Sequence, residues 1–303
     1  MKKVFVLCSA LLVSGMAFAQ EPEKNETQKT AETIYKSTEE AQKAEERPNG
    51  WLKQGNVSLL GSQSSFSQWQ AGGSNNLSLN FGFNYDINYK KDDWTWDNKL
   101  MASYGINRIK GESQQKTDDR LEINSILGKK ATENWYYSLF LNFKTQFDTG
   151  MDPDNPEERI SHFFSPAYLQ VGPGMLWKKN DNLKVNIAPA TSRFIFVHDH
   201  FTEFGESFGV EQGKTMRYEF GMAINAYYKF DVMENFSVEN ILNLYSNYLE
   251  DPQNVDIDYQ LNAVLKVNKY ISTNLTFQAI YDDNAYKGFQ TRHTLGVGFN
   301  MAF

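Results

Sequence analysis

Residues 77–89 read Leu-Ser-Leu-Asn-Phe-Gly-Phe-Asn-Tyr-Asp-Ile-Asn-Tyr. Every odd position carries a large apolar or aromatic side chain, and every even position carries Ser, Asn, Gly or Asp. Because the side chains of a β-strand point alternately to opposite faces, this segment builds one apolar face and one small polar face. A strand of this length is about twice as long as is usual in a soluble domain. It suits a tilted crossing of a lipid bilayer.

The same alternation recurs along the chain. We expect about twelve strands, which begin near Val57, Leu77, Trp94, Leu121, Trp135, Ala167, Leu183, Arg217, Asn235, Val255, Ile271 and Gln290. Short connections such as residues 90–93 alternate with longer ones such as residues 148–166. This pattern predicts an antiparallel transmembrane β-barrel over residues 51–303, with short periplasmic turns and longer extracellular loops.

Aromatic residues make up 15% of the chain, and many of them fall at the expected strand ends. Rings such as those of Trp94, Trp135 and Tyr270 lie beside the short connections. A second group lies beside the long ones and consists of Phe147, Phe163, Phe164, Tyr245, Tyr248 and Tyr281. Such rings prefer the headgroup level of a membrane, so two aromatic girdles are expected.

A soluble barrel with an apolar interior shows the same period of two. The polar face argues against it. That face holds Ser, Asn, Gly and Thr as often as Lys and Glu, whereas solvated surfaces are usually highly charged. The length of the strands also favours a membrane barrel, in which closure satisfies every backbone group in lipid.

The N-terminal residues differ from the rest. Residues 1–19 have a basic start, an apolar run and the small-x-small ending Ala17-Phe18-Ala19, which is typical of a secretory signal peptide. Cys8, the single cysteine, falls inside it, so no disulfide is expected in the mature chain. Residues 20–50 are rich in Glu, Lys, Gln and Thr and predict a flexible or partly helical periplasmic segment. A periplasmic partner could bind there.

The formal net charge of −7 argues against binding to nucleic acid, which requires a basic surface. The expected partner is instead the lipid bilayer of the outer membrane. No cofactor is expected, because no motif in the sequence has the spacing that a cofactor site requires.

Two places break the alternation. Pro173 and Pro189 fall inside expected strands, although proline removes a donor from the hydrogen-bond ladder. Apolar residues also change parity between Ile187 and Phe194. One extra residue would restore the pattern, so we predict a β-bulge between Pro189 and Phe194, with Arg193 directed away from lipid. Asn98 falls on the expected lipid face of its strand, and the sequence offers no reason for it.

Two arrangements of residues are candidates for a metal site or a catalytic site. His198-Asp199-His200 could contribute ligands to zinc, but no third ligand is fixed by spacing, and exposed loops often carry such residues. Known membrane lipases activate a Ser with a His, and no His here lies in such a motif, while His293 has lipid-facing parity. We therefore predict no catalytic, cofactor or metal site and expect that the protein is not an enzyme.

The charged members of the polar face are the candidate lumen-lining residues. They are Asp86, Asp97, Lys99, Glu122, Lys144, Arg217, Glu219, Lys229, Glu239, Asp256, Asp258, Lys266 and Arg292. Twelve strands lie between small filled barrels and open porins. The large residues of inward parity favour partial filling; they are Tyr136, Phe140, Tyr168, Tyr227 and Tyr245. The first hypothesis is a pore or passive transporter for small polar solutes. The alternatives are a plugged structural or partner-binding barrel, and an outer-membrane enzyme that acts on lipid.

Some motifs resemble a known family. The strongest is Ser-Ser-Phe-Ser-Gln-Trp-Gln-Ala-Gly-Gly at residues 64–73, followed by Asn-Asn-Leu at 75–77; Trp96-Asp97-Asn98 is a second. From about Trp51 onward, the chain resembles a Bacteroidota family of outer-membrane barrels of unknown function. This resemblance implies an outer-membrane barrel and no particular activity. The alternating residues Leu295, Val297, Phe299, Met301 and Phe303 resemble the signal that the barrel-insertion machinery reads.

Overall fold

The computed structural model describes residues 49–65, 74–112, 114–152, 155, 157–284 and 286–303. The predicted signal peptide, nearly all of the segment 20–50 and residues 66–73 of the family motif lie outside the described residues. The barrel lies within the unit Pro48–Phe303.

Twelve long antiparallel strands close into a barrel, as the sequence predicts. Around the wall they run in the order β1, β14, β13, β12, β11, β10, β9, β8, β5, β4, β3, β2. Their bounds are β1 Gly50–Ser64, β2 Asn76–Lys91, β3 Trp94–Ile109, β4 Gln115–Lys130, β5 Trp135–Thr145, β8 Ala167–Asn180, β9 Leu183–Phe196, β10 Met216–Met233, β11 Phe236–Asn247, β12 Val255–Lys266, β13 Ile271–Asp282 and β14 Tyr286–Ala302.

The long connections contain small elements of their own. Between β5 and β8, β6 (Gly150–Met151) and β7 (Arg159–Ser161) form a hairpin. Between β9 and β10 lies the short helix α2 (Asp199–Thr202). Among the described residues, no helix is long and apolar enough to cross a bilayer.

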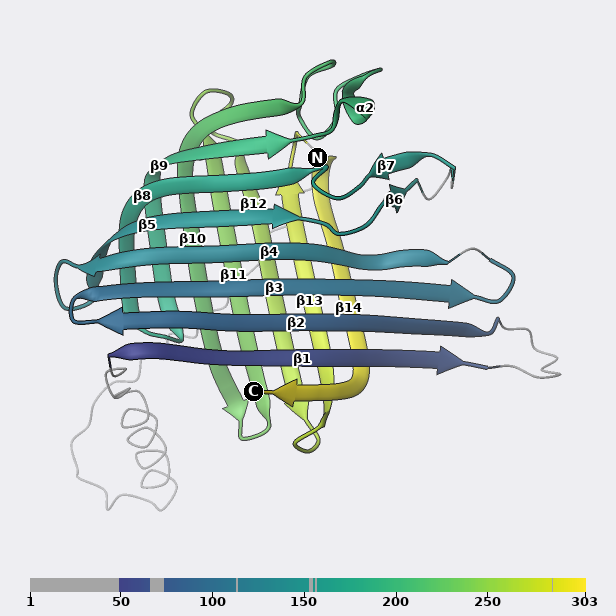
Figure 1. The fold of residues 1–303 in the computed structure, drawn as a ribbon, viewed down its shortest axis with the longest axis horizontal. Helices are drawn as coiled ribbons and strands as arrows, with labels where there is room; N and C mark the ends of the chain where they lie inside the picture. The colour runs from purple at the N-terminus through teal and green to yellow at the C-terminus, as the bar shows by residue number, and fades with distance from the viewer. Residues whose placement is uncertain (1–48, 66–73, 113, 153–154, 156, 285) are drawn as a thin grey trace, which may run out of the picture. The chain divides into compact units, whose positions relative to one another are not determined.

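The strands are steeply tilted. In Figure 1, β1 to β5 in front cross β11 to β13 behind, as the tilt of a closed barrel requires. The connections β2–β3, β4–β5, β8–β9, β10–β11 and β12–β13 have two to four residues, and those that follow β1, β3, β5, β9 and β11 are longer. Short and long connections thus alternate from β1 to β13, and each kind gathers at one end, called here the turn end and the loop end. The last loop-end link was predicted to be long, which is wrong: β14 begins at Tyr286, so this link has only the three residues 283–285.

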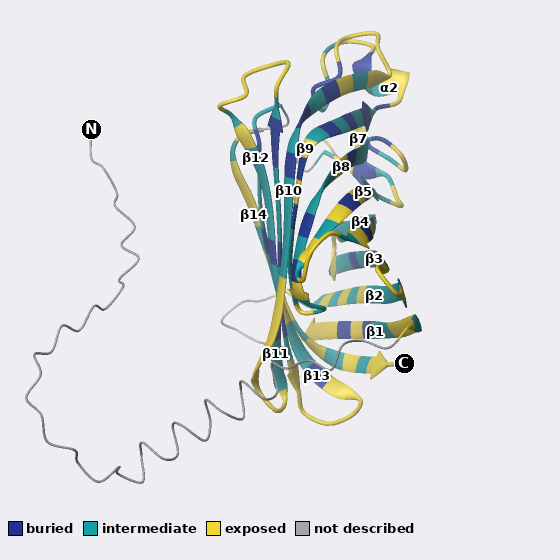
Figure 2. Ribbon diagram, turned by 90° about the vertical axis from the view of Figure 1, so that its left-hand side faces the viewer, coloured by how far each residue is buried: buried dark blue, intermediate teal, exposed yellow. Residues whose placement is uncertain are grey.

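The apolar face points outward. Along much of the wall, more buried and more exposed residues alternate, which Figure 2 shows as bands of different colour. Leu79, Phe81, Leu139 and Leu295 are exposed, whereas polar residues of the other parity, such as Glu122 and Gln260, are buried. An outward apolar surface around a closed strand ladder suits hydrocarbon and not water. The chain is therefore a transmembrane barrel.

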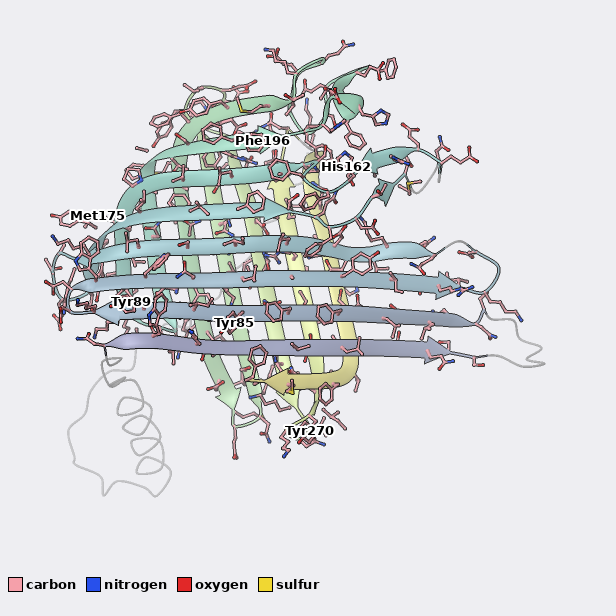
Figure 3. The ribbon with its side chains drawn as sticks, viewed as in Figure 1. Tyr85, Tyr89, His162, Met175, Phe196 and Tyr270 are labelled. Atoms are coloured by element: carbon pink, nitrogen blue, oxygen red, sulfur yellow. The ribbon has the colours of Figure 1, made fainter. Side chains whose placement is uncertain are left out.

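Aromatic rings gather at both ends of the wall. In Figure 3, Tyr89 and Tyr270 lie at the turn end, and Phe196 lies at the loop end. Ring centroids lie 4.8 Å apart for Trp51 and Tyr89, and 5.6 Å apart for Phe164 and Phe196. One assignment was wrong. Tyr245 is buried in the interior and not in the loop-end girdle, because odd residues of β11 point inward.

The predicted β-bulge is present in β9. Gly221 of β10 pairs with Thr191, but Ala223 pairs with Ala188, so β9 has one extra residue between them. Ala188 and Thr191 are both buried, and Arg193 points inward as expected. On the neighbouring strand β8, Gly174 makes room for the bulge, since a Cβ there would lie 2.4 Å from the Ile187 carbonyl oxygen.

The outward position of Asn98 is explained by its contacts. Its amide donates to the Ile87 carbonyl at 2.9 Å and accepts from the Ser125 hydroxyl at 2.7 Å. That hydroxyl accepts in turn from the Trp96 indole at 2.9 Å. Asn98 lies four residues into β3 from the turn end, so this satisfied polar group lies near the headgroup level.

Three strands begin earlier than predicted, at Gly50, Gln115 and Tyr286. In β1, the added residues are largely polar and lack the apolar alternation. They are held by backbone pairing with β2, from Gly50 opposite Lys90 to Asn56 opposite Asn84. The seam that closes the barrel is shorter, and pairs residues 56–61 of β1 with residues 297–302 of β14.

Candidate functional site

The interior of the barrel is the candidate site. One half of it is filled by side chains. Phe140, Ala188, Ala223 and Tyr245, from four different strands, form a buried cluster on which Ile126 packs. The large inward residues therefore fill part of the lumen, as the sequence suggests.

One ion pair spans the barrel near the turn end. Lys99 of β3 and Glu239 of β11 lie on opposite walls, because five strands separate β3 from β11 in either direction. Their Nζ and Oε1 atoms are nevertheless 2.9 Å apart. Asp86 lies 3.6 Å from the same ammonium, and Glu239 also accepts from the Tyr227 hydroxyl at 2.9 Å. This pair divides the lumen at its level.

A layer of charged and amide side chains crosses the lumen further toward the loop end. Arg120 of β4 donates to the Gln260 amide oxygen of β12 at 2.6 Å, again between opposite strands. It also pairs with Glu122, whose side chain is only 1% exposed. Lys144 pairs with Asp258 at 2.5 Å. These contacts join β4 and β5 to β12 across the interior.

Arg292 of β14 completes this layer on the other side. Its guanidinium forms an ion pair with Asp118 of β4 and donates to the Gln278 amide oxygen at 2.9 Å. Gln278 donates in turn to Asp258 at 2.7 Å. The layer is thus one connected network, in which every described charge has an opposite charge or an amide as its partner.

A third group of charges closes the filled half of the loop end. The guanidinium of Arg193 lies between Asp256, Asp282 at 3.1 Å and Glu219 at 3.5 Å. The ring centroids of Tyr168 and Tyr245 lie 5.4 and 5.0 Å from it. Glu219 also faces Arg217, which pairs with Glu250 of the following loop at 2.7 Å.

The other half of the interior is hollow. A cavity of about 770 Å³ lies between β1, β2 and β3 on one side and β12, β13 and β14 on the other. Amide and hydroxyl side chains dominate its walls. Lys229, Lys266 and Lys269, all exposed, line its turn-end mouth. A smaller cavity of about 130 Å³ shares Asp86 and Lys99 with it.

A vestibule of about 390 Å³ lies between β4, β5 and β8 on one wall and β13 and β14 on the other, toward the loop end. Arg120 and Arg292 line both the vestibule and the large cavity. The charged layer described above is therefore the partition between two hollow spaces that lie in sequence along the lumen.

All of the candidate lumen-lining residues have the inward parity. They form several separate groups and not one site. Lys99 pairs with Asp86 and Glu239, Lys144 with Asp258, and Arg217 with Glu219. Asp97 pairs with Lys178 and Lys184. The partners of Glu122, Asp256 and Arg292 are those given above. Lys229 and Lys266 line the cavity mouth.

The predicted set of lumen-lining residues lacks several of their partners. These are Asp118, Arg120, Lys178, Lys184, Arg193, Gln260 and Asp282. Arg120 could have been found, because it lies two residues before Glu122 and therefore on the same face. Sequence spacing does not indicate the contacts across the lumen, because these depend on which strands face each other in the closed barrel.

Among the described residues, one group of three potential metal ligands has its ligand atoms within 4.8 Å of one another, namely Asp256, Asp282 and Asp283, and it contains no histidine. The Nδ1 atom of His198 accepts from the His200 backbone N–H at 3.3 Å and caps α2. His162, labelled in Figure 3, lies beside His198 with ring centroids 5.2 Å apart, and its Nδ1 is 2.6 Å from the Phe163 carbonyl. His293 is exposed on the outer face of β14. The signal-like residues Leu295, Val297, Phe299, Met301 and Phe303 are also exposed there.

A family model described as "Protein of unknown function (DUF3078)" matches residues 62–151. The chain thus resembles an uncharacterised family over that range, which contains residues 64–73 and 96–98 of the predicted resemblance. The predicted extension of the resemblance from Trp51 to the C-terminus is not covered by the match. No curated protein matches the chain.

Solved structures of outer-membrane barrels are similar in fold. An outer membrane channel from Pseudomonas putida F1 has a TM-score of 0.40 and 10% identity, over 86% of this chain and 98% of that one. The NanC porin has a TM-score of 0.36 and 9% identity, over 81% of this chain and 98% of that one. The translocator domain of the autotransporter NalP from Neisseria meningitidis has a TM-score of 0.34 and 9% identity, over 91% of this chain and 95% of that one. Similarity at this level assigns no activity to this chain.

Proposed function

We propose that this protein is an outer-membrane barrel through which small polar solutes pass, and that the charged layer around Arg120 and Arg292 closes its lumen. The observation that carries the proposal is that the large cavity and the vestibule share these two side chains as a wall. A displacement of side chains alone would join the two spaces. The short turns then face the periplasm, and the longer loops face the outside.

The chemistry of the walls supports polar cargo. Hydroxyl and amide groups line the cavity, and they can exchange hydrogen bonds with a solute in place of water. Apolar side chains such as Leu60 and Met101 interrupt these polar groups in the hollow half, whereas the filled half is closed by the Phe140 cluster. Passage would therefore follow the large cavity beside β1, β2, β13 and β14, and then the vestibule between β4, β5 and β8 and the strands β13 and β14.

Single-channel current in a planar bilayer tests this proposal. The variant Asp118→Ser/Arg292→Ser removes both members of one ion pair, so no charge in the layer loses its partner. We expect brief or small currents from the unaltered protein, and larger and longer currents from this variant. The matched control is Glu211→Ser/Lys214→Ser, which removes an exposed pair of the loop between β9 and β10 and should leave the current unchanged.

A plugged structural or partner-binding barrel is the second candidate. It is favoured by the cross-lumen contacts, above all by the 2.9 Å pair between the opposite walls at Lys99 and Glu239. Absence of current from both the unaltered protein and the Asp118→Ser/Arg292→Ser variant, in bilayers where each is shown to be folded, would favour this candidate and overturn the channel.

A further inference from the structure

We propose that the turn-end mouth of the large cavity binds small anions that carry several hydrogen-bonding groups, such as sugar acids and related polyol anions. The inference rests on the proposed function for the passage of the solute, whereas the binding itself can be tested alone.

The charge of the mouth is positive and not neutralised. Lys229 and Lys266 have the inward parity near the ends of β10 and β12, and Lys269 lies in the following turn. None of the described carboxylates forms an ion pair with these three lysines. The ammonium of Lys269 instead lies 4.7 Å from the ring centroid of Tyr270.

The carboxylates of the cavity are all engaged. Asp86 and Glu239 face Lys99, and Asp118 faces Arg292. The group of Asp86, Glu239 and Lys99 keeps one negative charge and the pair of Asp118 and Arg292 keeps none, so the three lysines leave the net charge around the mouth positive. An anion is therefore attracted to this end of the lumen, and a cation is repelled.

Behind the lysines, the walls offer donors and acceptors. Seven asparagines line the cavity: Asn56, Asn80, Asn84, Asn262, Asn268, Asn274 and Asn300. Each carboxamide offers both N–H donors and an acceptor oxygen, so it can bind hydroxyl groups of either orientation. Inorganic anions such as chloride would use the lysines alone, whereas a polyol anion would use the lysines and the amides together.

Three open-chain polyols of similar size test this inference. They are the anion gluconate, the neutral sorbitol and the cation N-methylglucamine, each titrated calorimetrically into the purified mature chain in detergent. We expect gluconate to bind most tightly and N-methylglucamine least. The variant Lys229→Gln/Lys266→Gln should weaken gluconate binding about fivefold for each lysine removed, the effect of one partly solvated ion pair.

Lys53→Gln is the matched control, because Lys53 is an exposed lysine of β1 near the turn end that does not line the cavity. It should leave gluconate binding unchanged. Equal affinity for the three polyols, or unaltered gluconate binding by the double variant, would overturn the inference and leave the channel proposal standing. Selective gluconate binding by a barrel that passes no current would support the inference and overturn the channel.

Discussion

Lys99 and Glu239 come from opposite walls of the barrel, yet their charged atoms are 2.9 Å apart. Both side chains are more than four-fifths buried, with 17% and 18% exposed. Removal of one member therefore leaves a charge in the interior that water reaches poorly.

We expect Lys99→Met to lower the free energy of unfolding by about 2 kcal/mol, because Glu239 and Asp86 both lose their cation. Chemical unfolding from lipid vesicles, followed by tryptophan fluorescence, measures this change. The double variant Lys99→Met/Glu239→Gln leaves fewer unpaired charges and should be less destabilised. Equal losses for the single and double variants would show that the ion pair has no such role.

Arg193 should hold the filled half of the loop end together, because it lies between three carboxylates of different strands. In Arg193→Met, Glu219, Asp256 and Asp282 repel one another at close range. We expect the loops of residues 146–166 and 197–215 to be cleaved faster by added protease. Arg159→Met, an exposed arginine of β7, is the matched control and should be cleaved at the original rate.

The β-bulge of β9 can be tested by removal of its extra residue. Deletion of Ala190 would force either Arg193 toward lipid or residues 183–188 to change face. An arginine on the lipid face costs up to about 2–4 kcal/mol at the bilayer midplane. We expect a much smaller folded fraction after refolding into detergent, measured by heat-modifiable migration in gels. Deletion of Gly205, in the loop after α2 and with open space around it, should fold normally.

Acid should loosen the start of the loop between β5 and β8. The pKa of the Asp148 carboxyl lies below its ordinary value, chiefly through the hydrogen bond from the Tyr104 hydroxyl at 2.7 Å and next through the Thr149 backbone N–H. A lowered pKa stabilises the folded state fully above the ordinary pKa, and this contribution is lost as the pH falls through the lowered value.

We therefore expect the Thr149 amide resonance in NMR spectra to shift as the pH falls below about 4, the ordinary range of an aspartate. In Asp148→Asn, this transition should be absent. Asp251→Asn, which changes a carboxyl of another loop, should keep it. Persistence of the transition in Asp148→Asn would assign it to another group.

The architecture could be predicted from the sequence because each strand carries its own signal. Alternation at residues 77–89 and the short connections determine the faces and the order of neighbours without knowledge of distant contacts. The parity change before Phe194 identified the bulge for the same reason. It was placed only within the range from Pro189 to Phe194, and it lies at the start of that range.

The interior could not be predicted to the same degree. Parity shows that Lys99, Glu122 and Glu239 point inward, but their partners across the lumen depend on strand tilt and stagger around the whole barrel. Arg120 and Gln260 are 140 residues apart in the sequence. Tyr245 was expected both in the girdle, from its place near a strand end, and in the interior, from its parity; the strand register directs it inward.

The width of most closed barrels follows from the number and tilt of their strands. Here the ion pair between Lys99 and Glu239 adds a brace from wall to wall. Lateral tension in the bilayer, which pulls on the wall from outside, would have to break this pair before the cross-section could grow. The girth of this barrel is therefore coupled to electrostatic contacts across its lumen, of which this pair is the one nearest the turn end.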